Sequence, residues 1–472
     1  MSVEEAEAFK NEANIAFKEK HFSKAIELYT QAIELVPDSP VYLSNRAFAH
    51  LKLENFGAAL QDATRAIEID PTYTKAYYRR GSANMALLHF KEGLADFKKV
   101  VSAAKSDPDA RRKYKECAEA VRRIAFEEAI AVDHEEVEEV IDWRSIDVEE
   151  GYTGARMDDS GITLEFVMHM MQDFKDEKRL HRRYCFRLLE ICQEILDKLP
   201  PLVYADFPEG GQFTVCGDIH GQYYDLMNIF ALNGLPSEEN PYLFNGDFVD
   251  RGSFSTECIF TLIAFKCLYP NHFHMTRGNH ETINMNKIYG FDGEVRGKYS
   301  EELAKAFPRF FCSLPLSIII NRKAMVVHGG LFSKDGVKLS DIEKIDRFRE
   351  PPDEGLMCEL LWSDPQPQPG RAPSKRGVGV GFGPDVTANF LADNDLDLLI
   401  RSHEVKEEGY EVTHNGKCIT VFSAPNYCDQ MGNQGAYIRF EHDMKPQFHQ
   451  FEAVPHPAVR PMAYASPVFN YL

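Results

Sequence analysis

The chain has 472 residues, of which 44% are apolar, and a formal net charge of −20. This length leaves room for more than one domain, and the apolar fraction supports ordinary hydrophobic cores. An acidic chain without a basic stripe is a poor electrostatic partner for nucleic acid or anionic lipid, which disfavours nuclease activity. The acidic excess lies after residue 105, because residues 1–105 contain 14 Lys+Arg and 14 Asp+Glu.

The N-terminal sequence, MSVEEAEAFKNEANIAF, has acidic residues where a secretory signal needs basic ones, and no apolar run approaches membrane-spanning length. The ten cysteines show no CxxC pairing and lie mainly in apolar contexts. Such cysteines are typical of reduced core thiols. We therefore expect a protein of the cytoplasm, and also of the nucleus, without membrane insertion.

Small residues recur along residues 1–106 with a period of 34. Three columns keep this step: Ala13, Ala47 and Gly81; Ala25, Ala59 and Gly93; Ala32, Ala66 and Val100. A 34-residue period with small side chains at helix crossings is the tetratricopeptide signature of stacked helix pairs. The sequence therefore predicts an all-α solenoid of three repeats, at about 6–39, 40–73 and 74–107.

Polar side chains occupy the first helix of each predicted repeat, where a concave face could grip an extended peptide. Five of them are candidates for binding a peptide C-terminus with acidic side chains: Lys10, Asn14, Asn45, Lys75 and Arg79. These residues match the carboxylate-clamp positions of tetratricopeptide co-chaperones. The resemblance implies docking of the acidic C-terminal tail of the ninety-kilodalton heat-shock chaperone, and also of the seventy-kilodalton class.

Residues 107–150 are expected to form a capping helix, at 108–138, and an acidic connector. Cys117 and Arg123 have the spacing of a cysteine-dependent tyrosine phosphatase loop, but no glycine lies between them. The surrounding residues favour helix, whereas a thiolate phosphate cradle needs turned backbone amides. We therefore reject that interpretation.

Five short, strand-like apolar runs later in the chain each end near a potential metal ligand. The runs are FTVC, YLFN, FHMTR, AMVV and LDLLI, and the ligands that follow them are Asp218 with His220, Asp247, Asn279, His328 and His403. Strands with glycines at their exits can place such groups on one rim. An isolated Asp or His is usually a cap or a surface group, so the inference depends on their joint occurrence.

Oxygen and nitrogen donors without thiolate suit Mn²⁺, Fe or Zn²⁺, and the Asp247 carboxylate could bridge two ions. Two ions about 3.5–4 Å apart can hold a hydroxide nucleophile and clamp phosphate oxygens. His280 could then protonate the leaving group, with Asp250 fixing its tautomer. Arg251 and Arg376 could supply forked donors to phosphate; Arg376 lies in the Pro/Gly-rich stretch 365–384, which predicts a long surface loop.

The motifs GDIHG, GDFVDRG, GNHE, HGGL, RSHE and SAPNYC resemble the signature of the serine/threonine phosphoprotein phosphatases, over roughly residues 161–457. The resemblance implies a central β-sandwich flanked by helices, in an α/β metallophosphoesterase domain at 151–457 with a tail at 458–472. It also implies two metal ions, of which one is held by Asp218, His220 and Asp247 and the other by Asp247, Asn279, His328 and His403. His280 would be the acid, backed by Asp250, and the phosphate would lie among Arg251, Asn279, Arg376 and Tyr427.

Together these features predict a multidomain, monomeric enzyme that hydrolyses phosphoserine and phosphothreonine in proteins and is targeted by a chaperone-binding repeat domain. In the architecture that it resembles, the repeats also inhibit the catalytic domain. Two alternatives stay open: a non-catalytic chaperone adaptor, and a metallophosphoesterase that acts on nucleotides.

Overall fold

The computed structural model describes the chain except for residues 1, 105–106, 131–140, 159–160, 208–209 and 466–472. Two compact units can be distinguished: a helical unit from the N-terminal residues up to 138, and an α/β unit that spans residues 139–372 and 379–466. Each unit is described by itself. No helix among the described residues combines the length and the apolar character needed to span a membrane.

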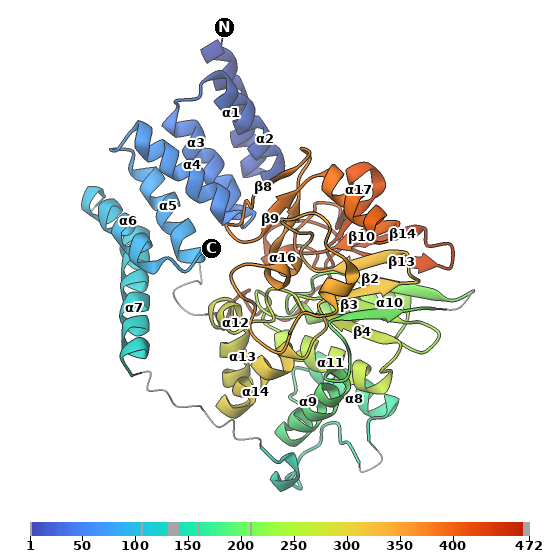
Figure 1. The fold of residues 1–472 in the computed structure, drawn as a ribbon. Coiled ribbons are helices and arrows are strands. Elements are labelled where there is room, and N and C mark those ends of the chain that lie inside the picture. The colour runs from blue at the N-terminus through green and yellow to red at the C-terminus, as the bar shows by residue number, and fades with distance from the viewer. Residues whose placement is uncertain (1, 105–106, 131–140, 159–160, 208–209, 466–472) are drawn as a thin grey trace. The chain divides into compact units, whose positions relative to one another are not determined.

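The helical unit consists of antiparallel helix pairs followed by a longer helix (Figure 1). Its helices are α1 (Ser2–Lys18), α2 (Phe22–Leu35), α3 (Pro40–Lys52), α4 (Phe56–Ile69), α5 (Thr74–Ala86), α6 (Phe90–Ala103) and α7 (Pro108–Ile130). Each helix from α1 to α6 packs against the helix that follows it in the chain. This arrangement confirms the predicted all-α solenoid; the part of the predicted capping helix at 131–138 lies outside the described residues.

Small side chains let the paired helices approach closely, as the 34-residue period predicted. Ala13, Ala25, Ala47 and Ala59 are all fully buried. A Cβ atom on Gly81 would lie 3.1 Å from the Phe97 ring of the partner helix. Larger residues in these columns would force the helices apart, because packed interiors have little free volume.

Cys117 and Arg123, whose spacing resembles that of a cysteine-dependent tyrosine phosphatase loop, lie within helix α7. Cys117 is fully buried, and its Sγ donates a hydrogen bond to the Phe90 carbonyl over 3.1 Å. Burial raises the pKa of the Cys117 thiol to about 12. A buried, protonated thiol on a helix does not offer the turned amides or the thiolate of a phosphate cradle.

The described part of the α/β unit is built on two large sheets and one small sheet. The six-stranded sheet has the order β1 (Leu202–Ala205), β5 (Ser317–Ile320), β6 (Ala324–Val327), β10 (Leu398–Arg401), β12 (Cys418–Val421), β11 (Tyr410–Thr413). The five-stranded sheet has the order β14 (Pro446–Phe451), β13 (Gly435–Glu441), β2 (Gln212–Cys216), β3 (Tyr242–Asn245), β4 (Phe273–Thr276). All five apolar runs of the sequence are strands, namely β2, β3, β4, β6 and β10.

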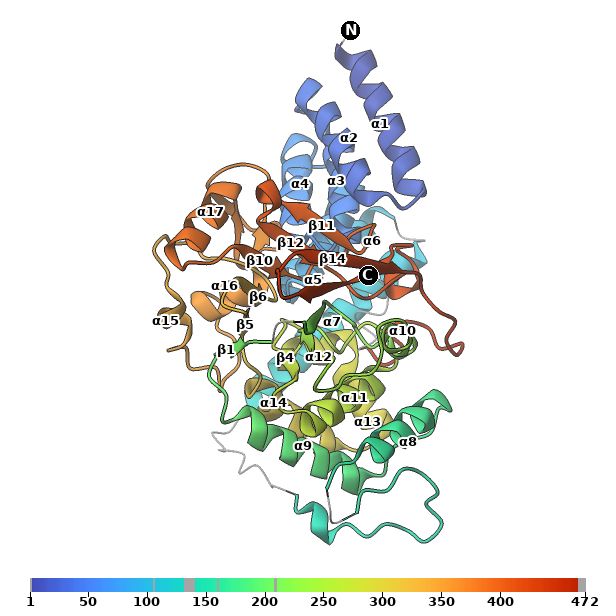
Figure 2. The same ribbon diagram turned by 90° about the vertical axis from the view of Figure 1, so that its right-hand side faces the viewer.

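Helices flank the two large sheets (Figures 1 and 2). They are α8 (Leu164–Lys175), α9 (Arg182–Leu196), α10 (Tyr223–Asn233), α11 (Ser255–Leu268), α12 (Ile283–Tyr289), α13 (Phe291–Lys298), α14 (Glu301–Cys312), α15 (Leu339–Ile342), α16 (Leu356–Trp362) and α17 (Pro384–Asp393). The inner faces of both sheets share one apolar core, which includes Val215, Leu243, Val326 and Ile400. Two sheets on a shared core are a β-sandwich, so the expected central sandwich flanked by helices is confirmed.

The stretch 365–384 is not a loop throughout, which corrects the sequence prediction. It contains β8 (Arg371–Pro373) and β9 (Val380–Phe382), which form the small sheet with β7 (Asp364–Pro365) in the order β7-β9-β8. Strands of two or three residues are too short to show an alternating pattern, and the surrounding prolines and glycines concealed them.

Candidate metal centre

The predicted ligands converge where the strands of both large sheets end. β2, β3 and β4 are parallel to one another, and β6 is parallel to β10. Asp218, Asp247 and Asn279 follow the first three strands, and His328 and His403 follow the other two. All five side chains and His220 are buried. The His403 amide donates a hydrogen bond to the Asp218 carboxylate, 185 positions away, so residues far apart in the sequence form one cluster.

Asp247 lies at the middle of this cluster. Its Oδ2 atom is 3.5 Å from Nε2 of His220 and 3.3 Å from Nε2 of His328. Among the residues that the structure describes, two sets of ligand atoms lie close enough to hold an ion, and Asp247 belongs to both: His220, Asp247 and His280, and Asp247, His328 and His403. A carboxylate that is shared between two such sets is the arrangement expected of a bridging ligand.

Asp218 lies beside both sets rather than in either. Its Oδ2 is 3.8 Å from Nε2 of His220, and its Oδ1 is 3.9 Å from Nδ1 of His328. The first set contains His280 where the sequence predicted Asp218. His280 also has a carboxylate partner on its other nitrogen, which suits proton transfer, so we retain Asp218 as the candidate ligand.

Hydrogen bonds to the backbone orient the imidazoles of two ligands. Nδ1 of His220 lies 3.0 Å from the Val249 carbonyl oxygen, and Nδ1 of His328 lies 2.8 Å from the Asn245 carbonyl oxygen. A proton on Nδ1 leaves Nε2 as the free electron-pair donor, which is the tautomer that a metal needs. Nε2 of His328 also lies 2.9 Å from Oδ1 of Asn279.

The backbone of the site is strained. Five non-glycine site residues have positive φ: His220, Asp247, Asp250, Arg251 and His403, with values from 47° to 71°. Such conformations cost about 1–3 kcal/mol each and persist only where the surroundings enforce them. Gly278 allows the close approach, since a Cβ atom there would lie 2.2 Å from Oδ1 of Asp247.

Glu281 is a site residue to which the sequence analysis gave no role. Its carboxylate is fully buried and accepts hydrogen bonds from the backbone amides of Asp247 (2.8 Å), Phe248 (2.9 Å) and Gly278 (2.9 Å). It therefore ties the exit of β3 to the exit of β4. Its place in GNHE, directly after His280, was the available signal.

The pKa values of the two buried carboxylates Asp218 and Asp247 shift in opposite directions. Burial raises the pKa of Asp218 to about 7. Burial also acts to raise the pKa of Asp247, but the neighbouring His328 and His280 outweigh it and hold this pKa well below its usual range. Burial lowers the pKa of His220 to about 3, which keeps the ring neutral. Burial acts to lower the pKa of His328, but the Asp247 and Asp218 carboxylates outweigh it and raise this pKa to about 9. An ionised Asp247 beside the neutral His220 suits a divalent cation, whereas His328 would have to release a proton to bind one.

His280 and Asp250 form a buried pair next to the ligands. Nδ1 of His280 lies 2.9 Å from Oδ2 of Asp250, and the His280 ring centroid is 4.8 Å from that of His220. Asp250 also accepts hydrogen bonds from Nδ2 of Asn286 (3.1 Å) and the amide of Phe291 (2.9 Å). These two bonds fix the carboxylate, which in turn fixes the imidazole.

Of the candidate phosphate ligands, Arg251 and Tyr427 lie in the α/β unit with the metal ligands, whereas Arg376 does not. Arg251 is buried, and its guanidinium carbon lies 3.7 Å from the centroid of the Tyr289 ring. The Tyr427 ring is 5.1 Å from the His220 ring. Arg376 belongs to the segment 373–378, which is not part of the α/β unit, so its role stays a prediction.

The predicted peptide clamp lies on the first helix of each pair in the helical unit. The Tyr29 hydroxyl and Nδ2 of Asn45 donate hydrogen bonds to Oδ1 of Asn14, over 2.7 Å and 3.5 Å, which joins the first two repeats. Lys10 forms an ion pair with Glu7 at 2.5 Å. The Arg79 guanidinium lies 3.5 Å from the centroid of the Phe48 ring, and Lys75 is exposed.

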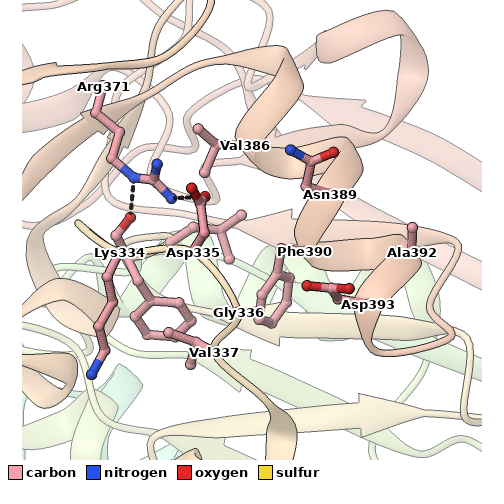
Figure 3. Close-up of a pocket in the computed structure, with 12 residues that line it drawn as sticks. Lys334, Asp335, Gly336, Val337, Arg371, Val386, Asn389, Phe390, Ala392 and Asp393 are labelled. Atoms are coloured by element: carbon pink, nitrogen blue, oxygen red, sulfur yellow. Dashed lines mark hydrogen bonds and ion pairs between the residues drawn. The ribbon is translucent and has the colours of Figure 1, made fainter.

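A separate cavity of about 320 Å³ lies beside α17, and the residues that line it include none of the predicted site residues (Figure 3). Its wall is held by Arg371, which donates from Nε to the Phe332 carbonyl over 2.6 Å and from Nη2 to Asp335 over 2.8 Å. Phe390 and Val337 supply apolar surface. The cavity is therefore distinct from the metal centre.

Comparison with known proteins identifies the class first. Residues 211–407 match the family model of the calcineurin-like phosphoesterases, residues 114–204 match a PPP5 TPR repeat region, and residues 1–81 match the TPR repeats of BSK1-like serine/threonine-protein kinases. The α/β unit is thus a metallophosphoesterase preceded by tetratricopeptide repeats.

Full-length relatives identify the family. The chain is 59% identical to serine/threonine-protein phosphatase 5 of Arabidopsis thaliana, with 98% of this chain and 97% of the relative covered. It is 56% identical to the human protein of the same name, with 98% and 94% covered. The chain belongs to the serine/threonine-protein phosphatase 5 family, and it is accordingly a protein phosphatase of the metallophosphoesterase class.

A solved structure supports the same assignment. A Saccharomyces cerevisiae protein serine/threonine phosphatase, described as similar to human phosphatase PP5, aligns with a TM-score of 0.62 and 43% identity. The alignment covers 64% of this chain and all of that one.

Proposed function

We propose that the α/β unit hydrolyses phosphoserine and phosphothreonine by a two-metal mechanism in which hydroxide attacks the phosphorus directly. The observation that carries this proposal is Asp247, whose Oδ2 lies within 3.5 Å of imidazole nitrogens on both sides. When bound, two divalent ions would activate a water molecule as nucleophile and polarise the phosphoryl oxygens. The proposed ligands are Asp218, His220, Asp247, Asn279, His328 and His403.

The donor chemistry of the site fits Mn²⁺, Fe or Zn²⁺. The ligands supply carboxylate oxygen, amide oxygen and imidazole nitrogen but no thiolate. His220 and His328 have their second nitrogen engaged by a backbone carbonyl, the outer contact that orients metal-binding imidazoles. We expect Mn²⁺ to support activity in vitro.

The remaining residues would bind phosphate and move a proton. His280, oriented by Asp250, would donate a proton to the serine or threonine oxygen as the phosphorus–oxygen bond breaks. Arg251, Asn279, Tyr427 and Arg376 would bind the phosphoryl oxygens, because arginine presents two parallel donors to an anion. No covalent phosphoenzyme is needed.

The experiment compares substrates with Mn²⁺ present. We expect hydrolysis of p-nitrophenyl phosphate and of a phosphothreonine peptide, with much slower hydrolysis of a dinucleotide polyphosphate. Loss of all hydrolysis in the Asp247→Asn variant would link the activity to the shared ligand. Equal turnover of peptide and dinucleotide would favour the nucleotide phosphoesterase, and no turnover of any substrate would favour the adaptor.

We propose that the helical unit, with boundaries near residues 1–106 and a connector to residue 150, binds the acidic tail of the ninety-kilodalton heat-shock chaperone, and also of the seventy-kilodalton class. Support comes from the positions of Lys10, Asn14, Asn45, Lys75 and Arg79 on the first helix of each pair. Cations and carboxamides in a row suit a peptide carboxylate and its acidic side chains.

We also propose that the repeats inhibit the catalytic domain at 151–457, and that the enzyme acts as a monomer in the cytoplasm and nucleus. Deletion of residues 1–130 should raise the turnover of p-nitrophenyl phosphate. Unchanged turnover after this deletion would contradict autoinhibition without affecting the catalytic proposal.

A further inference from the structure

The phosphate-binding candidate Arg251 contacts a segment near the end of the described chain. Residues 459–465, here called the C-terminal strap, come more than 200 positions after it. The Met462 amide donates a hydrogen bond to the Arg251 carbonyl over 2.7 Å. In the reverse direction, Nη1 of Arg251 donates to the Met462 sulfur over 3.9 Å. Strap and arginine are therefore joined through both backbone and side chain.

Arg251 lies between Met462 and Tyr289. Its amide donates to the Tyr289 carbonyl over 3.1 Å, and its guanidinium lies over the Tyr289 ring at 3.7 Å. Arg251 is only 2% exposed and Met462 only 8%. A long, flexible side chain that is held on two sides loses less freedom when it binds phosphate, so the affinity for phosphate rises.

The chemistry of the thioether suits this position. A sulfur atom is a weak acceptor that can orient an N–H group without neutralising the positive charge. A carboxylate in the same place would orient the arginine more strongly but would also compete with phosphate for it. Met462 therefore orients the Arg251 guanidinium without itself neutralising the positive charge.

The strap is fixed independently of Arg251. The Ser253 hydroxyl donates to the Arg460 carbonyl over 2.7 Å and accepts from the Ala463 amide over 3.3 Å. Gly293 makes room for the strap, because a Cβ atom there would lie 2.3 Å from the Tyr464 carbonyl oxygen. Lys298 lies 5.6 Å from the Tyr464 ring centroid. Contacts on both sides of Met462 hold its sulfur in place.

We propose that Met462 is a positioning residue, which orients the Arg251 guanidinium for the phosphoryl group through the strap. The inference rests on the phosphate role proposed for Arg251 and extends that role to a residue outside the phosphatase motifs. It makes the C-terminal strap part of the substrate-binding apparatus.

The test uses the full chain with Mn²⁺ and two probes, p-nitrophenyl phosphate as substrate and inorganic phosphate as inhibitor. Met462→Leu keeps the volume but removes the acceptor, so it should fold normally. We expect KM and the inhibition constant of phosphate to rise together by about three- to tenfold, with a smaller change in kcat. Met462→Gln, which restores an acceptor of similar length, should recover most of this loss.

A second substitution perturbs the strap from the other side. Gly293→Ala introduces a methyl group against the Tyr464 carbonyl and should weaken phosphate binding in the same direction. Met168→Leu, on the exposed face of α8, is the matched control and should leave both constants unchanged. Metal content should stay at the wild-type value in all these variants, and the melting temperature should stay at the wild-type value in the Met462 and Met168 variants.

A double-mutant cycle separates positioning from general packing. In an Arg251→Lys background, Met462→Leu should change the inhibition constant of phosphate by less than about twofold, since the group that it orients has been removed. Full additivity of the two substitutions, or wild-type constants for Met462→Leu, would overturn the inference. An inactive wild-type protein would instead overturn the proposed function itself.

Discussion

Nδ1 of His280 lies 2.9 Å from Oδ2 of Asp250, and both side chains are buried. Because the carboxylate engages Nδ1, we expect Nε2 to be the atom that exchanges a proton with a substrate. His280→Asn should therefore lower kcat by about 10²–10⁴-fold. The measurement is steady-state turnover of p-nitrophenyl phosphate, together with metal analysis of the purified variant.

The metal analysis decides what the loss means. If the role of His280 is proton transfer, its variant keeps the wild-type metal content. A parallel loss of metal and activity would make His280 a ligand, as its grouping with His220 and Asp247 allows. Asp250→Asn should give a smaller loss, because the imidazole is kept but its orientation is weakened.

Glu281 should matter for metal affinity although it is not a proposed ligand. Its carboxylate accepts three backbone N–H bonds around the Asp247 loop. In Glu281→Gln, one carboxylate oxygen becomes an NH₂ group, which cannot accept a hydrogen bond from the backbone amide that it faces. We expect the affinity for Mn²⁺ to fall by about 10–100-fold, as is usual when an outer contact of a metal site is lost. Titration of activity with Mn²⁺ measures this change.

Excess metal supplies the control for Glu281. At saturating Mn²⁺, the variant should approach the wild-type kcat, because the catalytic groups themselves are unchanged. A kcat that stays low at every Mn²⁺ concentration would show that Glu281 acts on the chemical step instead.

Lys75→Ala combined with Arg79→Ala should abolish binding of a peptide that ends in acidic residues and a free carboxylate. Burial lowers the pKa of Arg79 to about 10, so the guanidinium is still charged at neutral pH. Calorimetry on the full chain gives the affinity. Binding that survives the double substitution would place the peptide site elsewhere.

Two controls accompany the clamp experiment. Arg79 stacks on Phe48, so circular dichroism must show that the repeats stay folded; the single variant Lys75→Ala avoids this difficulty because Lys75 is exposed. Lys24→Ala, on the second helix of the first pair, removes an exposed lysine outside the clamp. It should leave the affinity unchanged.

The buried side chain of His274 should make the stability of the α/β unit depend on pH. Burial lowers the pKa of His274 to about 3, whereas an unfolded histidine has a pKa of about 6.5. Between these values the unfolded state binds a proton that the native state does not, so stability rises with pH and is lost as the pH falls below about 6.5. The slope from one such group reaches about 1.4 kcal/mol per pH unit.

Urea denaturation at pH 7 and pH 5 tests this prediction. His274→Phe keeps the stacking on Phe213, whose ring lies 5.7 Å away, but removes the titrating group. The variant should lose less stability than the wild type between the two pH values. Equal losses in the two proteins would show that His274 does not contribute.

Much of this protein is predictable from local patterns. The 34-residue period of small residues predicted stacked helices, because helix crossings demand small side chains wherever the backbones approach. The run YLFN before Gly246 and Asp247 predicted a buried strand ending at a ligand, and β3 is that strand. The short strands β8 and β9 were missed, because three residues carry no periodic signal.

The contacts within the site required the fold. The place of Glu281 in GNHE could mark it as a site residue but not as the acceptor of three backbone amides. Nothing near Met462 in the sequence indicates that it contacts Arg251. His403 and Asp218 lie 185 residues apart, yet the His403 amide bonds to the Asp218 carboxylate. Such pairs depend on how strands from two sheets end at one rim.

The sequence by itself determined which residues could bind metal, phosphate and peptide, because chemical type and spacing along a strand or helix are local properties. Only the tertiary structure decided that Asp247 lies between two imidazoles, that His280 faces Asp250, and that the strap reaches Arg251. The physical reason is that these distances arise from the packing of two sheets on a shared core, and no single segment of the chain contains that information.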